Sequence, residues 1–230
     1  MLVHDLGLMP YNDAWRLQER IHAEVVDGAE ERLLLVEHPP VITFGRRPNV
    51  QRNLIASDDQ LAKLGVEVVQ SDRGGDITFH GPGQLVAYPI IRLNDHKLSV
   101  GAYVRQLEHL AIATLADLGI EAQKDTCAVG VWVRSSLATG NSQPATLSKI
   151  AALGVRIRRG VSMHGLALNV TTDLRYFDLI IPCGLANRPV TSIQALLGPR
   201  APTMDTVKQT LTRCFHSAFA NDHVILTNHS

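Results

Sequence analysis

The sequence predicts an α+β fold in which a mixed or antiparallel β-sheet is flanked by helices. Apolar runs typical of strands come in adjacent groups along the chain and do not alternate strictly with helices, which argues against a parallel α/β fold. Segments with the spacing of amphipathic helices separate these groups. Because no repeat or linker-like stretch divides the chain, we expect one domain over residues 1–230.

The N-terminal part is expected to begin with a helix. Residues 11–26 carry apolar side chains at helical spacing, and Asn12 or Asp13 is placed to cap the N-terminus. Apolar runs at 32–37 and 41–44, separated by a His-Pro-Pro stop, predict two short strands. A helix followed by neighbouring strands is therefore the expected start of the fold.

The next stretch is predicted to alternate short elements with turns. Residues 58–64 indicate a short helix, and 66–69 a strand. The β-type runs at 76–80 and 84–91 are joined by Gly-Pro-Gly at 81–83, which predicts a hairpin-like connection between them.

The second half is expected to place two long helices around further strands. A serine precedes the first of these helices, and the closing helix is amphipathic. Small polar residues at 135–145 indicate a loop. The expected helices span 99–118 and 203–219, and the expected strands 128–133, 150–157, 165–170 and 224–226.

Composition excludes several classes of protein. Lys and Arg number 22, as do Asp and Glu, so the formal charge is zero and lacks the basic excess of nucleic-acid-binding proteins. No apolar run reaches the roughly 18 residues of a membrane helix, and no secretory signal is visible. Three cysteines without CxxC spacing, and ten histidines without HExxH spacing, predict neither disulfides nor a metal site. We expect a cytoplasmic protein without metal or cofactor that binds neither nucleic acid nor membrane.

A glycine-rich segment at 73–84 is the densest candidate for a binding site. Its four glycines allow the backbone to approach a ligand closely, and Arg73 and His80 are suited to orient a carbonyl or carboxylate. The segment lacks the Lys-Ser/Thr end of a Walker A loop and the GxGxxG spacing of dinucleotide sites. A hairpin that binds no ligand is an equally good interpretation of this spacing alone.

Cys183 is the candidate nucleophile among the three cysteines. It follows an apolar run and stands between a proline and a glycine, where a turn can expose the thiol and direct backbone N–H groups at an oxyanion. A buried structural cysteine is the alternative. Cys127 beside an expected strand and Cys214 on the closing helix are interpreted as core or surface residues.

Lys149 is the candidate base. It leads into the apolar run 150–157, and Ala151 and Ala152 leave space beside it. A lysine partly withdrawn from water loses its proton more readily, so it can accept one near neutral pH. The alternative is a solvated lysine at a strand end.

Several segments together resemble the lipoyl(octanoyl) transferase family. Residues 73–89 closely resemble the family signature, and the match continues in the same order through four other segments. These are 35–46, 149–157, 161–170 and 181–185. The chain departs from the family at 134–147, which is longer than the hairpin expected there.

The resemblance implies roles for individual residues. Cys183 corresponds to the acyl-thioester nucleophile and Lys149 to the lysine that pairs with it. Substrate-binding residues correspond to three stretches. They are Arg73, Gly74, Gly75, Asp76, Ile77, Thr78, Phe79 and His80 in the first, Ala152, Leu153 and Gly154 in the second, and Gly165, Leu166 and Ala167 in the third.

The resemblance also implies a fold and an activity. The fold is expected to be similar to the catalytic domain of biotin and lipoate protein ligases. The implied enzyme is an acyltransferase that moves an octanoyl group from octanoyl-acyl carrier protein to a lysine of the lipoyl domains of 2-oxoacid dehydrogenases and of the glycine cleavage H protein. Two alternatives stay open: an ATP-dependent lipoate or biotin-type ligase, which needs no nucleophilic cysteine, and a non-catalytic lipoyl-carrier binding module.

Arginines near these motifs are candidates for binding acidic partner proteins. We expect Arg73 to lie inside the site. Arg156, Arg158 and Arg159 are the candidates for a basic rim, since arginine pairs well with carboxylates and phosphates.

Overall fold

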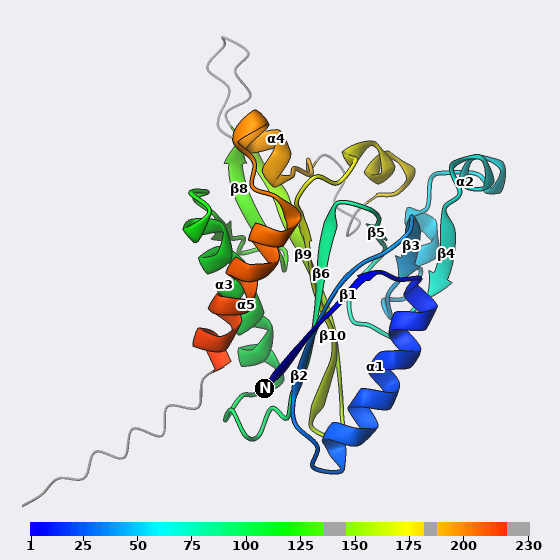
Figure 1. Ribbon diagram of the computed structural model, residues 1–230. Helices are drawn as coiled ribbons and strands as arrows, with labels where there is room; N and C mark the ends of the chain where they lie inside the picture. Colours follow the sequence, from blue (N-terminus) through cyan, green and yellow to red (C-terminus); the bar gives the residue numbers. More distant parts are fainter. Residues whose placement is uncertain (136–145, 182–187, 220–230) are drawn as a thin grey trace, which may run out of the picture.

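The computed structural model describes residues 1–135, 146–181 and 188–219, and within them the strands form two sheets (Figure 1). The seven strands of the large sheet follow the order β1 (Leu2–Leu8), β2 (Arg32–Glu37), β6 (Gln84–Ile90), β10 (Val161–Asn169), β9 (Thr146–Arg158), β8 (Val131–Ser135) and β7 (Gln123–Lys124). The small sheet has the order β4 (Glu67–Gln70), β3 (Val41–Phe44) and β5 (Thr78–His80). β1 pairs with β2 and β3 with β4 in parallel, and the other pairs of neighbouring strands are antiparallel. The predicted α+β fold with a mixed sheet is confirmed.

Helices cover both faces of the large sheet. α1 (Tyr11–Val26) packs on one face, and α3 (Val100–Asp117) and α5 (Met204–Phe219) pack together on the other (Figure 1). Ser99 caps α3 by accepting the N–H of Ala102. The shorter helices are η1 (Val50–Asn53), α2 (Asp58–Leu64), η2 (Leu174–Leu179), α4 (Ile193–Leu197) and η4 (Gly198–Arg200).

The uninterrupted apolar run of β2 follows from burial on both faces. Leu33 and Leu35 belong to the core under α3 and α5, whereas Leu34 and Val36 belong to the core under α1. Successive strand residues point to opposite faces, so a strand buried on both sides has no polar positions to alternate with.

The first helix begins one residue earlier than its expected caps. α1 starts at Tyr11, and the residue at the N-cap position is Pro10, which makes no side-chain capping bond. The prediction of Asn12 or Asp13 as the cap is therefore wrong. Both side chains have other partners, since Asn12 donates to Glu67 and Asp13 pairs with Arg16.

The predicted hairpin between 76–80 and 84–91 is also wrong. β5 pairs with β3 in the small sheet, whereas β6 lies between β2 and β10 in the large sheet. Gly83 explains the change of sheet: its N–H donates to Glu37, and its carbonyl accepts the N–H groups of Val170 and Thr171. These bonds hold the connection against the large sheet, so the glycine-rich segment spans both sheets.

Two strands differ from the sequence-based expectation in ways that bear on the site. β1 was not predicted, and it forms an edge of the large sheet. β9 begins at Thr146, so Lys149 lies inside the strand and not before it. The expected loop at 135–145, most of the long 134–147 segment and the expected strand at 224–226 lie outside the described residues.

Candidate active site

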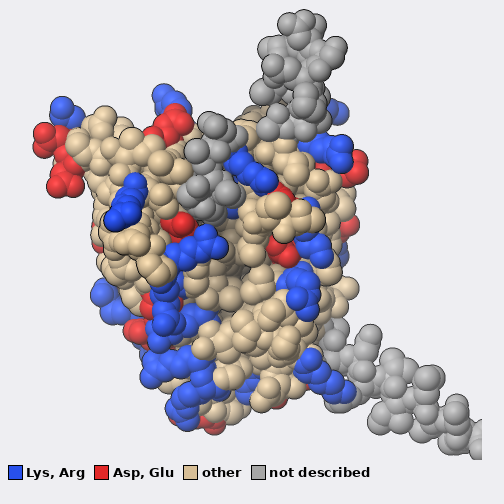
Figure 2. Space-filling model, turned by 180° about the vertical axis from the view of Figure 1, so that it is seen from behind, with Lys and Arg blue, Asp and Glu red and all other residues tan. Residues whose placement is uncertain are grey.

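A cavity of about 370 Å³ lies among the motifs that the sequence analysis selected. The face shown in Figure 2 is hollowed near its centre, with basic side chains along one side of the hollow. Lys149 and every residue predicted to bind substrate except Phe79 line the cavity. These residues are Arg73, Gly74, Gly75, Asp76, Ile77, Thr78, His80, Ala152, Leu153, Gly154, Gly165, Leu166 and Ala167.

Phe79 points into the core of the small sheet. It is 1% exposed, stacks on Tyr176 with ring centroids 4.7 Å apart, and meets Phe177 edge to face. Its neighbours Thr78 and His80 line the cavity because alternate strand residues face opposite ways.

Arg73 supplies a buried cation at the cavity. The side chain is 7% exposed, and its guanidinium donates to the Thr43 carbonyl at 2.7 Å and to the Thr43 hydroxyl at 2.9 and 3.1 Å. It also donates to the carbonyl of Gly74 at 3.1 Å. These bonds fix the group in the position predicted for it, inside the site.

The glycine-rich segment and β9 touch backbone to backbone. The N–H of Gly74 donates to the carbonyl of Val155 at 2.9 Å. A Cβ on Gly154 would lie 2.8 Å from the Gly74 oxygen and 3.2 Å from the Cδ of Arg73. Glycine at position 154 therefore allows the backbone of the glycine-rich segment 73–84 to pack directly against β9.

The uncharged rings of Tyr88, His38 and His80 form a polar cluster at the cavity wall and just behind it. Tyr88 donates its hydroxyl proton to Nε2 of His38 at 2.9 Å, while Nδ1 of His38 donates to the Met9 carbonyl. Burial lowers the pKa of His38 to about 4, and burial together with His38 and Arg73 lowers the pKa of His80 well below its usual value. Both imidazoles are therefore uncharged at neutral pH. Tyr88 and His80 line the cavity directly.

His164 is fixed in an unusual backbone conformation beside these rings. Its φ is +56°, in the left-handed region, and its N–H donates to the side chain of Gln18. Nε2 lies 2.6 Å from Asp72, which also pairs with Arg156. Burial, with Arg73 and Arg156 nearby, lowers the pKa of His164 to about 3. The strained conformation at a cavity wall is typical of functional sites.

Lys149 projects from β9 into a largely enclosed place. It is 7% exposed, its Nζ lies 3.4 Å from the carbonyl oxygen of Val129, and it sits 4.7 Å above the ring of Trp132. Arg188 lies 4.9 Å from the same ring. The burial agrees with the expectation of a lysine withdrawn from water.

Cys183 lies outside the described residues, but the segments on either side of it are placed. The N–H of Ile181 donates to the Asn53 carbonyl at 2.7 Å, and the Asn53 side chain donates to Asp76 at the cavity. On the other side, the N–H of Lys149 donates to the carbonyl of Pro189 at 2.8 Å.

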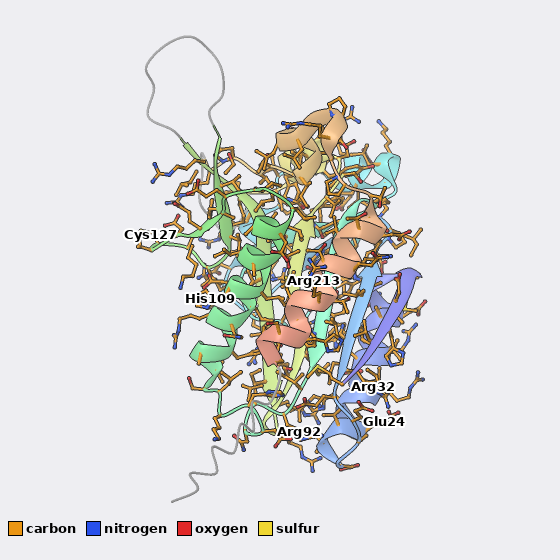
Figure 3. All side chains as sticks on the ribbon, turned by 60° about the vertical axis from the view of Figure 1, so that its left-hand side comes forward. Glu24, Arg32, Arg92, His109, Cys127 and Arg213 are labelled. Carbon is orange, nitrogen blue, oxygen red and sulfur yellow. The ribbon has the colours of Figure 1, made fainter. Side chains whose placement is uncertain are left out.

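The other two cysteines differ in their surroundings. Cys127 is exposed in the turn before β8 (Figure 3), as in the surface alternative given for it, and it also lines the cavity. Cys214 is half-buried on α5, where burial raises the pKa of its thiol. The sequence around Cys127 gave no indication of the cavity, because the residues opposite it come from distant segments.

The three arginines expected to form the rim do not line the cavity. Arg156 pairs with Asp72, and Arg158 and Arg159 lie at the turn that joins β9 to β10. Arg47, from the segment after β3, does line the cavity and lies 3.8 Å from Asp76. Lys149 stands near the opposite end of β9.

Two further properties concern the described residues alone. Among residues 1–135, 146–181 and 188–219, no group of three or more His, Cys, Asp or Glu side chains is arranged to hold a metal ion. None of the helices in these ranges combines the length and the apolar character needed to cross a membrane.

Comparison with known proteins gives the family. The model of the lipoyl protein ligase A/B catalytic domain matches residues 10–216. An octanoyltransferase of Solibacter usitatus is 48% identical, covering 94% of this chain and 92% of the relative. One of Chloroflexus aurantiacus is 45% identical, covering 96% and 94%. The chain belongs to the octanoyltransferase family.

Solved structures show that this family member shares its fold with protein ligases. A lipoate-protein ligase A bound with ATP superimposes with a TM-score of 0.72 at 19% identity, covering 95% of this chain and 85% of the ligase. A putative lipoate protein ligase of Thermoplasma acidophilum with bound lipoic acid gives 0.71 at 19% identity, covering 95% and 86%. A biotin protein ligase of Aquifex aeolicus gives 0.50 at 10% identity, covering 94% and 67%. The fold expected from the sequence motifs is thereby confirmed.

Proposed function

We propose that this protein transfers an octanoyl group from octanoyl-acyl carrier protein to a lysine of a lipoyl domain through a thioester on Cys183. The relatives named octanoyltransferase, 45–48% identical over nearly the whole chain, carry this proposal. The proposed acceptors are the lipoyl domains of 2-oxoacid dehydrogenases and the glycine cleavage H protein.

In the proposed mechanism, Cys183 and Lys149 form a catalytic dyad that carries out two successive acyl transfers. Lys149 accepts the thiol proton of Cys183, and the thiolate attacks the carbonyl carbon of the donor thioester. The carrier thiolate leaves and takes the proton from Lys149. The ε-amine of the acceptor lysine then attacks the Cys183 thioester, the amide forms, and the amine proton passes through Lys149 as the Cys183 thiol is restored. Each step exchanges one acyl bond for another, so no nucleotide is consumed.

Three observations on the described residues support this assignment. Lys149 is 7% exposed and lines the cavity. Ile181, two residues before Cys183, is bonded to Asn53, whose side chain donates to Asp76 at the cavity, and Pro189, six residues after Cys183, is bonded to Lys149. Aliphatic residues of β9 and β10 next to Lys149 offer an apolar surface to the acyl chain, where each buried methylene contributes about 0.8 kcal/mol. These residues are Ala152, Leu153, Leu166 and Ala167.

Intact-mass spectrometry after incubation with octanoyl carrier protein tests the proposal. Replacing the thiol hydrogen by an octanoyl group adds about 126 Da, as expected for a covalent acyl-enzyme. The parent and Cys214→Ala proteins should gain this mass without ATP, and the lipoyl domain added next should remove it. Cys183→Ala should gain no mass. Transfer that requires ATP, or a Cys183→Ala protein that still acylates the lipoyl domain, would show a ligase or a different nucleophile.

A further inference from the structure

One peptide group of the chain contacts two charged side chains from opposite sides. The peptide between Val129 and Gly130 receives a hydrogen bond from Lys149, whose Nζ lies 3.4 Å from the Val129 carbonyl oxygen. The N–H of the same peptide, on Gly130, donates to Oε1 of Glu108 at 3.1 Å. We propose that Glu108 is a positioning residue for Lys149 and acts on it through this peptide group. The inference rests on the role proposed for Lys149.

Glu108 has no part in the acyl-transfer steps, yet it is buried. Its side chain is 6% exposed on α3, a helix whose buried face is otherwise largely apolar. A carboxylate is rarely buried without a hydrogen-bonding partner, because its removal from water is costly. The Gly130 N–H is such a partner, and it belongs to the loop that holds the Lys149 ammonium.

The backbone at Gly130 ties this peptide to Lys149. Its φ is +140°, a conformation that residues with a side chain rarely adopt. A Cβ at this position would lie 3.1 Å from Cε of Lys149 and 3.0 Å from the Ala151 carbonyl oxygen. The loop therefore approaches β9 so closely that the peptide and the lysine side chain share one small space.

The arrangement orients the side chain of Lys149. A negative charge at the N–H end of a peptide polarises the group, so that its carbonyl oxygen becomes a stronger acceptor. The Val129 oxygen then holds Nζ of Lys149 in one direction within the cavity, which is where the proposed mechanism needs its nitrogen. Among the residues that the structure describes, charged groups near Lys149 include Arg188, across the Trp132 ring, and Asp125, which pairs with Arg188.

The test compares Glu108→Gln with Glu31→Gln. Glutamine at 108 keeps an oxygen that accepts the Gly130 N–H but removes the charge. Glu31 is a matched control because it is also buried, at 8% exposure, and accepts the N–H of Arg92 at 2.7 Å far along the chain from Lys149. The first readout is the rate at which acetic anhydride labels Lys149 as a function of pH, followed by peptide mass spectrometry. The second is kcat and KM for octanoyl carrier protein.

The expected result is specific to position 108. In Glu108→Gln, Lys149 should be labelled about threefold faster at pH 7.5, since its nitrogen is held less firmly against the Val129 carbonyl oxygen. kcat should fall about fivefold with KM changed less than twofold, and Glu31→Gln should match the parent in both readouts. Labelling curves of Glu108→Gln and the parent that coincide, or a change equal to that in Glu31→Gln, would overturn the proposal. Failure of the dyad itself is seen separately, as full transfer activity in Lys149→Arg.

Discussion

The backbones of Lys149 and Thr191 are joined, with the Thr191 N–H donating to the Lys149 carbonyl oxygen at 2.9 Å. The Lys149 N–H in turn donates to Pro189, so Val190 forms an isolated parallel bridge with β9. The chain that follows residues 182–187 is therefore held in fixed register against the proposed base.

A chain of side-chain hydrogen bonds connects this register to the glycine-rich segment. His80 donates to Gln84 at 2.7 Å, Gln84 donates to Asn169 at 2.9 Å, and Asn169 donates to the Thr191 carbonyl at 3.0 Å. All three side chains are buried, so each lost bond leaves a polar atom without water to replace its partner. The cavity wall at His80 and the backbone at Lys149 are thus parts of one network.

Replacing Lys149 by arginine should remove the base but keep the charge. Arginine holds its proton throughout the pH range in which proteins fold, so it cannot accept one from Cys183. We expect kcat for octanoyl transfer to fall about a thousandfold, the range of general-base contributions. Steady-state kinetics and a thermal melt are the measurements. Activity within tenfold of the parent in a folded Lys149→Arg protein would assign Lys149 a structural role only.

A larger residue at position 154 should force the first two motifs apart. In Gly154→Val the new side chain meets the Gly74 carbonyl and Arg73, so the Gly74 N–H to Val155 bond is expected to break. Overpacking of this kind costs about 1–3 kcal/mol of unfolding free energy. Urea unfolding should show that loss, and KM for the octanoyl donor should rise. Gly101→Ala in α3 is the control for a glycine substitution away from the cavity, because the only close atom there among the described residues is the flexible end of the Arg105 side chain. A Gly154→Val protein with parental KM would contradict the close contact.

Acid should destabilise the protein through the buried histidines. His38 has a folded pKa of about 4 against an ordinary value of 6.5, and the pKa of His80 is also lowered. Between pH 4 and pH 6.5 the His38 side chain binds a proton in the unfolded state but not in the folded state. The unfolding free energy therefore falls as the pH drops from about 6.5 toward 4. Each histidine contributes at most about 1.4 kcal/mol per pH unit. Urea unfolding at pH 7.5, 6 and 5 measures the slope, which should be shallower in His38→Gln. Equal slopes in the two proteins would exclude His38 as a cause.

The cavity arginine should matter more for the donor than the arginines of the hairpin turn. Arg47 is 63% exposed at the cavity, so Arg47→Glu should lower kcat/KM for an acidic carrier protein about fivefold at low salt. The difference should shrink above about 0.15 M salt, where screening acts over about 8 Å. Arg158→Glu, at the turn between β9 and β10, should change kcat/KM much less. A larger effect of Arg158→Glu would place the donor at the hairpin turn.

The sequence predicted the elements whose limits are marked by local chemistry. β2 and β3 have the expected bounds because Pro39 and Pro40 separate two apolar runs. α2 likewise begins at a capping box on Ser57 and ends at Gly65 in the left-handed conformation. β1 was missed because it is a largely exposed edge strand without an apolar run, and it pairs with a strand some 30 residues later in the chain.

The candidate site was predictable only where residues lie in continuous motifs. The cavity-lining stretches around Arg73, Gly154 and Gly165 were all selected from the sequence through their family resemblance. Tyr11 was not, because it reaches the cavity from a helix and its own neighbours in sequence carry no sign of the contact. The position of such a residue at the cavity depends on how distant segments pack together. The spacing of side chains within one segment does not reveal that packing.

The change of sheet at Gly83 has a consequence for how the protein assembles. β5 and β6 are neighbours in sequence, but β5 belongs to the small sheet and β6 to the large sheet. Residues of both strands line the cavity. The part of the cavity wall that the large sheet supplies requires β6 to pair with β10, whose residues come about 80 positions later in the chain. Contacts of such long sequence separation form late and slowly. On refolding, helical and strand signals are therefore expected to return before the ability to hold an acyl chain, and the acyl-binding competence of a nascent chain must wait until β10 has been synthesised.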